Sequence, residues 1–249
     1  MVTTRLVLVH HAGGSRLLYR GWERLLPADW EVVALDAPGR GRAHNTPASD
    51  NVEALADRLL DRVLTGPETR LALFGHSTGA ALVTRMASKM VAAGTRPVWL
   101  GLSGWTGRVA DVPAAVRDLT DEKLLPLLHR WGGTPSTLLT DAGLRGQVLP
   151  LVRADLEALA GFDPMADRSW LTLPLSLFSG LHDPGAGVAE LAVLAARAPR
   201  LLNVHLHPGD HFYLTEHPAD VAAQITADLG TALRWREVQS RPRRATRSD

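Results

Sequence analysis

The 249-residue sequence contains no cysteine. This absence excludes disulfide bonds, a thiol nucleophile, and zinc or iron–sulfur sites with cysteine ligands. Long apolar runs are also missing. None approaches the ~18 residues that a membrane-spanning helix requires, and the apolar stretch before His10 is too short for a signal peptide. We therefore expect a soluble, cytoplasmic protein.

An excess of charge of one sign is missing as well. The 27 basic residues, of which only Lys89 and Lys123 are lysines, nearly balance 26 acidic residues, and the net charge is +1. A composition rich in arginine, alanine and leucine is typical of a GC-rich genome, so the arginine content does not indicate nucleic-acid binding. Residues 234–249 carry six arginines against two acidic residues and lack a hydrophobic period, which predicts a basic, disordered tail.

Short apolar runs alternate with longer segments of helical period. The apolar runs, typical of parallel strands covered on both faces, are residues 6–9, 32–35, 71–74, 98–102, 173–178 and 202–206. Helices are expected at residues 17–26, 51–64, 79–92, 188–197 and 217–233. This alternation predicts an α/β fold with a mostly parallel central sheet flanked by helices.

The alternation is interrupted between residues 102 and 173. This stretch contains amphipathic segments at residues 121–131, 141–149 and 151–161, and no strand is expected in it. Because the interval is far longer than an ordinary connection, we expect a functional helical insertion, a lid, over about residues 105–170.

A glycine-flanked serine lies between an expected strand and an expected helix, in the sequence Gly75-His76-Ser77-Thr78-Gly79. This is the context of a nucleophile elbow, a sharp strand-to-helix turn that exposes a serine hydroxyl above the sheet. The two glycines leave room for neighbouring backbone. A serine in an ordinary turn is the alternative, but the flanking strand and helix favour Ser77 as a nucleophile.

An elbow predicts an acid and then a histidine, each on a loop after a later strand. Of the ten histidines, His211 lies between the last expected strand and the last expected helix, and we expect it to be the general base. Asp183 is the first carboxylate after the strand at residues 173–178 and is expected to orient the His211 ring. The alternatives are a turn-forming role for Asp183 before Pro184, and Asp210 as the acid.

A serine nucleophile also needs donors for the oxyanion. We expect the backbone N–H groups of Thr78, directly after the nucleophile, and of Ala12, in the glycine-rich loop after the first strand. The N–H of His11 is the alternative second donor. The His10-His11 pair has no further ligands beside it in the sequence, so we expect no metal site.

Several separate blocks agree with one known family. They are Ala12-Gly13-Gly14-Ser15, Pro38-Gly39-Arg40-Gly41-Arg42, the Ser77 elbow, Leu119-Thr120-Asp121-Glu122-Lys123-Leu124, Gly132-Gly133-Thr134-Pro135, Arg153-Ala154-Asp155, Asp183-Pro184 and Gly209-Asp210-His211-Phe212. Over about residues 5–230 the chain resembles the type II thioesterases of polyketide and nonribosomal peptide assembly lines, which are α/β-hydrolases. The resemblance implies a triad of Ser77, Asp183 and His211, with an oxyanion hole at Ala12 and Thr78.

The resemblance also implies an activity and a partner. A discrete serine thioesterase would hydrolyse acyl groups from the phosphopantetheine of an acyl or peptidyl carrier protein, without a cofactor of its own. Residues 1–233 would form a single α/β-hydrolase domain. By the resemblance we expect a monomer, and we expect no binding of nucleic acid or membrane. The lid would line an acyl channel, to which His11, Trp105 and Trp131 are assigned.

Other functions fit part of the same pattern. A product-releasing thioesterase or cyclase, an ester hydrolase of the same fold, an acyltransferase and a catalytically inactive binding protein are the alternatives. Arg40, Arg42 and Arg153 either meet a phosphate or an acidic carrier protein, or form structural ion pairs.

Overall fold

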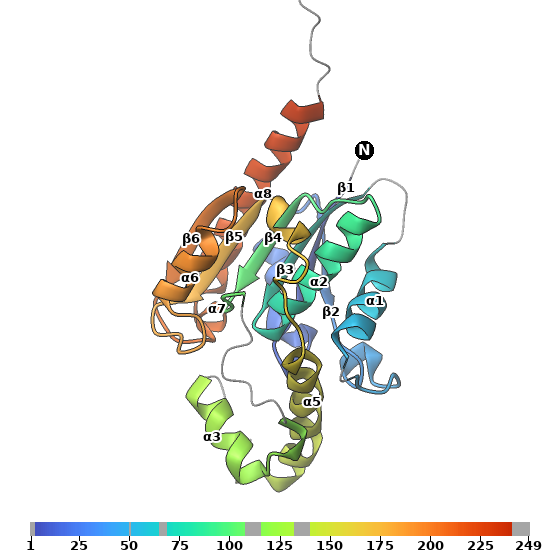
Figure 1. Ribbon diagram of the computed structural model, residues 1–249, viewed down its shortest axis with the longest axis vertical. Helices are drawn as coiled ribbons and strands as arrows, with labels where there is room; N and C mark the ends of the chain where they lie inside the picture. The colour runs from blue at the N-terminus through green and yellow to red at the C-terminus, as the bar shows by residue number, and fades with distance from the viewer. Residues whose placement is uncertain (1–2, 50, 65–68, 108–115, 132–139, 241–249) are drawn as a thin grey trace, which may run out of the picture.

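The computed structural model describes residues 3–49, 51–64, 69–107, 116–131 and 140–240. Within these ranges six strands form one sheet, in the order β2-β1-β3-β4-β5-β6, and every neighbouring pair is parallel (Figure 1). The strands are β1 (Thr3–Val9), β2 (Trp30–Leu35), β3 (Thr69–His76), β4 (Trp99–Ser103), β5 (Leu175–Gly180) and β6 (Leu201–His207). The predicted α/β fold with a parallel sheet is confirmed.

Helices cover both faces of this sheet. The larger core lies under α1 (Val52–Val63), α2 (Thr78–Ala92) and α6 (Val188–Ala195), which are in front of the sheet in Figure 1. The second core lies under α8 (Pro218–Ser240) and the one-turn helix α7 (Tyr213–Glu216). No helix within the described ranges is both long and apolar enough to span a membrane.

Burial on both faces explains why the strands are nearly continuous apolar runs. In β1, Val7 and Val9 point into the larger core, whereas Leu6 and Leu8 point into the second. All four side chains are at most 1% exposed. A strand with polar residues on one face would leave one of the two helical layers without an apolar partner.

Two of the helix predictions were wrong. Residues 17–26 form two short 3₁₀ helices, η1 (Arg16–Tyr19) and η2 (Trp22–Arg24), because Gly21 between them has a φ of 86°. Residues 141–149 and 151–161, predicted as separate helices, belong to the single helix α5 (Ala142–Ala160), which continues through Pro150. A proline normally ends or kinks a helix, but apolar side chains from both halves pack into one cluster that holds α5 together.

The predicted tail is also partly wrong. The helix α8 continues to Ser240, so residues 234–240 are helical. The Arg200 guanidinium lies 5.6 Å from the ring centre of Trp235, and Arg70 forms an ion pair with Glu237 at 3.5 Å. These two contacts with the body of the protein stabilise the last turns of α8, although the sequence there shows no hydrophobic period. The remainder of the tail, residues 241–249, lies outside the described residues.

The predicted helical insertion lies between β4 and β5. It contains η4 (Val116–Asp118), α3 (Asp121–Trp131), α5 and η5 (Ser169–Thr172). Figure 1 shows α3 and much of α5 beyond the end of the sheet. A separate apolar cluster, here called the lid cluster, joins these helices through Val116, Leu124, Leu127, Leu149, Val152 and Leu156. The block Gly132-Gly133-Thr134-Pro135 lies outside the described residues.

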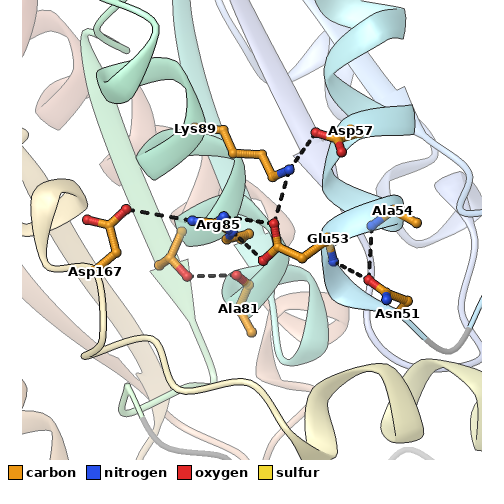
Figure 2. Close-up of polar contacts among 9 residues, drawn as sticks. Asn51, Glu53, Ala54, Asp57, Ala81, Arg85, Lys89 and Asp167 are labelled. Atoms are coloured by element: carbon orange, nitrogen blue, oxygen red, sulfur yellow. Dashed lines mark hydrogen bonds and ion pairs between the residues drawn. The ribbon is translucent and has the colours of Figure 1, made fainter.

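A network of charged side chains joins α1 to α2 (Figure 2). Arg85 donates two hydrogen bonds to the Glu53 carboxylate, at 2.6 and 2.7 Å, and Lys89 lies 2.6 Å from Asp57 and 3.1 Å from Glu53. The hydrogen bonds from Arg85 lower the pKa of Glu53. Because these groups are partly exposed, each pair contributes at most about 1 kcal/mol, and the apolar cores hold the helices in place.

The apolar face of α1 provides a test of this packing. Leu59 is 1% exposed, whereas Leu64, at the end of the same helix, is 52% exposed. We expect Leu59→Ala to lower the free energy of unfolding by about 2–5 kcal/mol, because it leaves a cavity in the core. The matched change Leu64→Ala should stay within about 0.5 kcal/mol. Urea unfolding measures both, and equal losses would contradict the assigned packing.

Candidate active site

The turn between β3 and α2 holds Ser77 in an unusual backbone conformation. Its φ is 58° and its ψ is −120°, and within the described part of the chain it is the only non-glycine residue with a positive φ. Such conformations cost about 1–3 kcal/mol and persist where surrounding contacts impose them. Here the Ser77 N–H donates to the Ser103 carbonyl at 2.8 Å, and the Ser77 carbonyl accepts from the Ala80 N–H at 2.9 Å.

The two glycines of the elbow allow backbone segments to approach closely. A Cβ atom on Gly75 would lie 2.1 Å from the carbonyl oxygen of Gly79. A Cβ on Gly79 would lie 2.3 Å from the carbonyl oxygen of Val9 and 2.6 Å from that of His10. The expectation that these glycines leave room for neighbouring backbone is therefore confirmed. The close approach also places the start of α2 against the loop after β1.

The structure brings Asp183 and His211 together. Asp183 follows β5 and His211 follows β6, and the carboxylate Oδ2 lies 2.8 Å from the ring Nδ1. Both residues are buried, at 4% and 7% exposed. An ionised carboxylate can only accept hydrogen bonds, so the ring proton of His211 is on Nδ1. The other ring nitrogen, Nε2, then has a free lone pair. Asp210, the alternative acid, instead accepts the N–H of Phe212 at 2.8 Å.

The ring of His211 lies beside the serine turn. Its centre is 4.8 Å from that of His76, the residue before Ser77. A Cβ on Gly104 would lie 2.9 Å from His76 Cε1 and 3.0 Å from His211 Cε1, so both rings rest on the same glycine. The described contacts of Ser77 do not include a hydrogen bond from its hydroxyl to His211. In enzymes without bound substrate this bond is often long and forms only in the complex.

The two expected oxyanion donors occupy adjacent segments. Thr78 is the first residue of α2, where an N–H has no partner within the helix. In the loop after β1, the N–H of Gly13 donates to Asp155 at 2.7 Å and that of Gly14 donates to the His11 carbonyl at 3.0 Å. Because both glycine N–H groups are engaged within the protein, Ala12 and His11 remain the candidates in this loop.

The chain as a whole is similar to known proteins. Residues 4–229 match the family model of the thioesterase domain. Thioesterase PikA5 of Streptomyces venezuelae is 31% identical over 229 residues, which cover 90% of this chain and 80% of that protein. Gramicidin S biosynthesis protein GrsT of Aneurinibacillus migulanus is 28% identical, with 85% and 83% covered. The solved structure of the thioesterase RedJ, from prodiginine biosynthesis in Streptomyces coelicolor, has a TM-score of 0.77 at 29% identity and covers 90% of this chain and 85% of that chain.

The chain belongs to the thioesterase family. It is similar in structure to the type II thioesterase BorB of the borrelidin cluster, with a TM-score of 0.76, 25% identity and 92% of each chain covered. The resemblance inferred from the sequence blocks is confirmed: the protein is a type II thioesterase of the polyketide and nonribosomal peptide class, with the α/β-hydrolase fold.

Three further histidines lie at or beside the serine turn of this thioesterase: His76 precedes Ser77, and His10 and His11 follow β1. His76 is fully buried, with Nδ1 2.8 Å from the Ser103 hydroxyl, and burial holds its pKa well below the ordinary value. His10 Nε2 accepts the N–H of Ala37 at 3.1 Å, so its Nδ1 donates to the His11 carbonyl at 2.7 Å, and burial lowers its pKa. The rings of His10 and His76 are therefore neutral at neutral pH.

His11 is the third of these histidines. Its Nδ1 donates to the Ala12 carbonyl at 2.9 Å, and burial together with the neighbouring His10 lowers its pKa to about 3. The ring packs edge-on against Phe212, with centres 4.8 Å apart. Among the described residues no group of three or more histidine and carboxylate side chains could hold a metal ion.

The three residues assigned to an acyl channel occupy different surroundings. His11 is partly buried beside the serine turn. Trp105 is 6% exposed in the larger core, with its ring centre 6.1 Å from that of Trp170. Trp131 is partly buried against the lid cluster. The channel role remains a prediction for all three.

Two of the three arginines form structural contacts. Arg40 makes a two-pronged ion pair with Asp155, and both side chains are buried. Arg153 binds the carbonyls of Val116 and Leu119 and the carboxylate of Asp121, so it joins α5 to the start of α3. Arg42 is exposed. The Asp155 contact was missed from the sequence, although its residues lie in two of the blocks shared with the family.

The elbow glycines give a prediction that does not depend on activity. Gly79→Ala should lower the free energy of unfolding by about 1–3 kcal/mol, because its Cβ meets backbone that has no room to move. Gly146→Ala, inside α5 with no neighbouring atom within 4 Å, should raise it by about 0.4–1 kcal/mol. Chemical unfolding of the two variants measures the difference. Stabilisation by Gly79→Ala would show that the turn is not packed as described.

The buried histidines give a pH dependence of stability. Below the ordinary pKa of 6.5, His76 gains a proton in the unfolded chain but not in the folded one, because folding lowers its pKa. The free energy of unfolding should therefore fall with acidification, by up to about 1.4 kcal/mol per pH unit for each such histidine. His76→Asn should reduce the slope between pH 6 and 5 by about 1 kcal/mol per unit. Urea unfolding at both pH values tests this, and parallel losses in variant and wild type would contradict it.

Proposed function

We propose that this thioesterase hydrolyses acyl groups from the phosphopantetheine of carrier proteins in a polyketide or nonribosomal peptide synthase, and so edits and regenerates the assembly line. Ser77 is the nucleophile, His211 the general base and Asp183 the residue that orients it. The observation that carries this proposal is the 2.8 Å contact between His211 Nδ1 and the Asp183 carboxylate, beside the strained turn at Ser77.

The reaction has two halves. The Ser77 hydroxyl attacks the thioester carbonyl while His211 Nε2 takes its proton, and Asp183 stabilises the resulting imidazolium. As the carbon–sulfur bond breaks, His211 returns the proton to the departing thiol. Water then attacks the acyl-enzyme with the same base, which releases a free acid and restores Ser77.

The negative oxygen of each tetrahedral intermediate needs donors that are in place beforehand. The N–H groups of Thr78 and Ala12 supply them in this proposal. Removal of one such donor typically costs about 10²–10³ in rate, so the backbone around Ala12 matters as much as a catalytic side chain. No cofactor takes part, because the phosphopantetheine arrives with the substrate.

The relatives support an assembly-line substrate. GrsT is named for gramicidin S biosynthesis, BorB comes from the borrelidin cluster, and YbtT, 25% identical with a TM-score of 0.77, is a type II thioesterase of the yersiniabactin pathway. The partner proposed for this chain is accordingly an acyl or peptidyl carrier protein. The apolar faces of α3 and α5 would line the path of the acyl chain.

The Asp183 and Asp210 pair gives a matched test of this mechanism. Ser77→Ala should abolish two activities: the hydrolysis of acyl-loaded carrier proteins, which mass spectrometry measures, and the labelling of the enzyme by a fluorophosphonate. Asp183→Asn should lower kcat by about 10⁴-fold, because the wrong nitrogen of His211 then carries the proton. Asp210→Asn, which alters only the turn before Phe212, should stay within about tenfold of the wild type.

Three outcomes would contradict the proposal. They are activity that survives Ser77→Ala, equal losses for the two aspartate variants, and faster hydrolysis of matched oxygen esters than of carrier-protein thioesters. The last result would favour an ester hydrolase of the same fold. A cyclic product in place of the free acid would favour the product-releasing alternative.

A further inference from the structure

A buried ion pair joins the lid to the body of the protein. Arg40 follows β2, and Asp155 lies on α5. Arg40 Nη2 donates to Asp155 Oδ1 at 2.8 Å and Nη1 donates to Oδ2 at 2.5 Å, and the residues are 6% and 7% exposed. Removal of two charges from water offsets most of their attraction, so such pairs add little net stability. A geometric role is therefore the better explanation.

Both members of the pair also hold the loop after β1. Asp155 Oδ2 accepts the N–H of Gly13 at 2.7 Å, and Arg40 Nη1 donates to the Gly14 carbonyl at 3.3 Å. Three segments that lie far apart in the sequence thus meet at one carboxylate. The loop residues held there directly follow Ala12, the proposed oxyanion donor.

Apolar contacts fix the same loop against the lid. A Cβ on Gly13, which has a φ of 69°, would lie 2.3 Å from Val152 Cγ2 on α5. The side chain of Ala12 packs against the lid cluster. The position of Ala12 is therefore set by α5 on one side and by the end of β1 on the other.

We propose that Arg40 and Asp155 are positioning residues for the oxyanion hole, and that α5 holds the Ala12 N–H in its catalytic position. This inference rests on the proposed function, since it assumes a reaction with an oxyanion at Ser77. A movement that lifted α5 from the body would break the Gly13 contact. The rate of turnover then depends on the position of α5, because the Ala12 N–H is in its catalytic position only while α5 is against the body.

The loss of rate expected when Asp155 is changed follows from how strongly catalysis depends on the position of an oxyanion donor. A displacement of about 1 Å can cost about 10²-fold in rate, and complete loss of a donor costs about 10²–10³. In Asp155→Asn, the neutral amide keeps one oxygen but loses the strong pairing with Arg40. We therefore expect a loss of about 10–100-fold in kcat, with KM within about threefold, because the oxyanion forms only in the transition state.

The matched control is Asp228→Asn. Asp228, on α8, is 2% exposed and its carboxylate accepts hydrogen bonds from Asn203 and His205, so it is also a buried, hydrogen-bonded carboxylate. Each full-length variant is measured in three ways: melting temperature, kcat and KM with an acyl-loaded carrier protein, and the rate of Ser77 labelling by an alkyl fluorophosphonate. The phosphonylation rate reports the oxyanion hole whatever thioester is the true substrate.

The expected result is slower labelling and lower kcat, by about the same factor, in Asp155→Asn alone. Asp228→Asn should lower the melting temperature and leave kcat per labelled Ser77 unchanged. Arg40→Lys keeps a positive charge beside the Asp155 carboxylate, so it should retain more activity than Arg40→Met.

Two results would overturn the inference. One is labelling and kcat of Asp155→Asn within threefold of the wild type. The other is a loss that equals the loss in Asp228→Asn and follows the melting temperature. Failure of the proposed function would give a different result, because the wild type would then leave every carrier-protein thioester intact. The labelling rates of the variants would still show whether Asp155 positions the loop after β1.

Discussion

The strained backbone at Ser77 is the constraint on which the rest of the site depends. A serine with a φ of 58° is unfavourable by itself. It persists because Gly75 and Gly79 let neighbouring backbone approach within distances that no side chain would allow, and because Ser103 on the next strand accepts its N–H. The two packed cores on either side of the sheet stabilise this turn. The free energy gained by burial in these cores thus offsets the strain of holding a partly exposed Ser77 at a fixed point.

A parallel sheet then gathers the other groups. The loops that follow β1, β3, β5 and β6 all leave the same edge of the sheet, and they carry Ala12, Ser77, Asp183 and His211. The strand order places β3 in the interior of the sheet, with β1 on one side and β4 on the other. The loop after β1 therefore lies on one side of the serine turn, and the His211 ring lies on the other, against Gly104.

Local patterns in the sequence account for the strands, the elbow and the order of the expected triad, because each depends on burial or on residues that are neighbours along the chain. The failures are long-range effects. Pro150 lies inside α5 because the lid cluster holds both halves of the helix, and α8 extends past its hydrophobic period because Arg200 and Arg70 contact it. Arg40 and Asp155 are 115 residues apart. Their blocks were visible in the sequence, but only the fold shows that they meet.

The surroundings of the histidines at the site support the proposal that His211 is the base. His10, His11 and His76 each use Nδ1 on a carbonyl or hydroxyl oxygen, and their pKa values are lowered by burial. For His10, the attraction of the Asp155 and Asp36 carboxylates raises the pKa, but the cost of burying a charged ring is larger. His211 alone among these four has a carboxylate on Nδ1. The imidazolium of the proposed mechanism is therefore stabilised at this ring, and the neutral rings of His76 and His11 beside it add no positive charge.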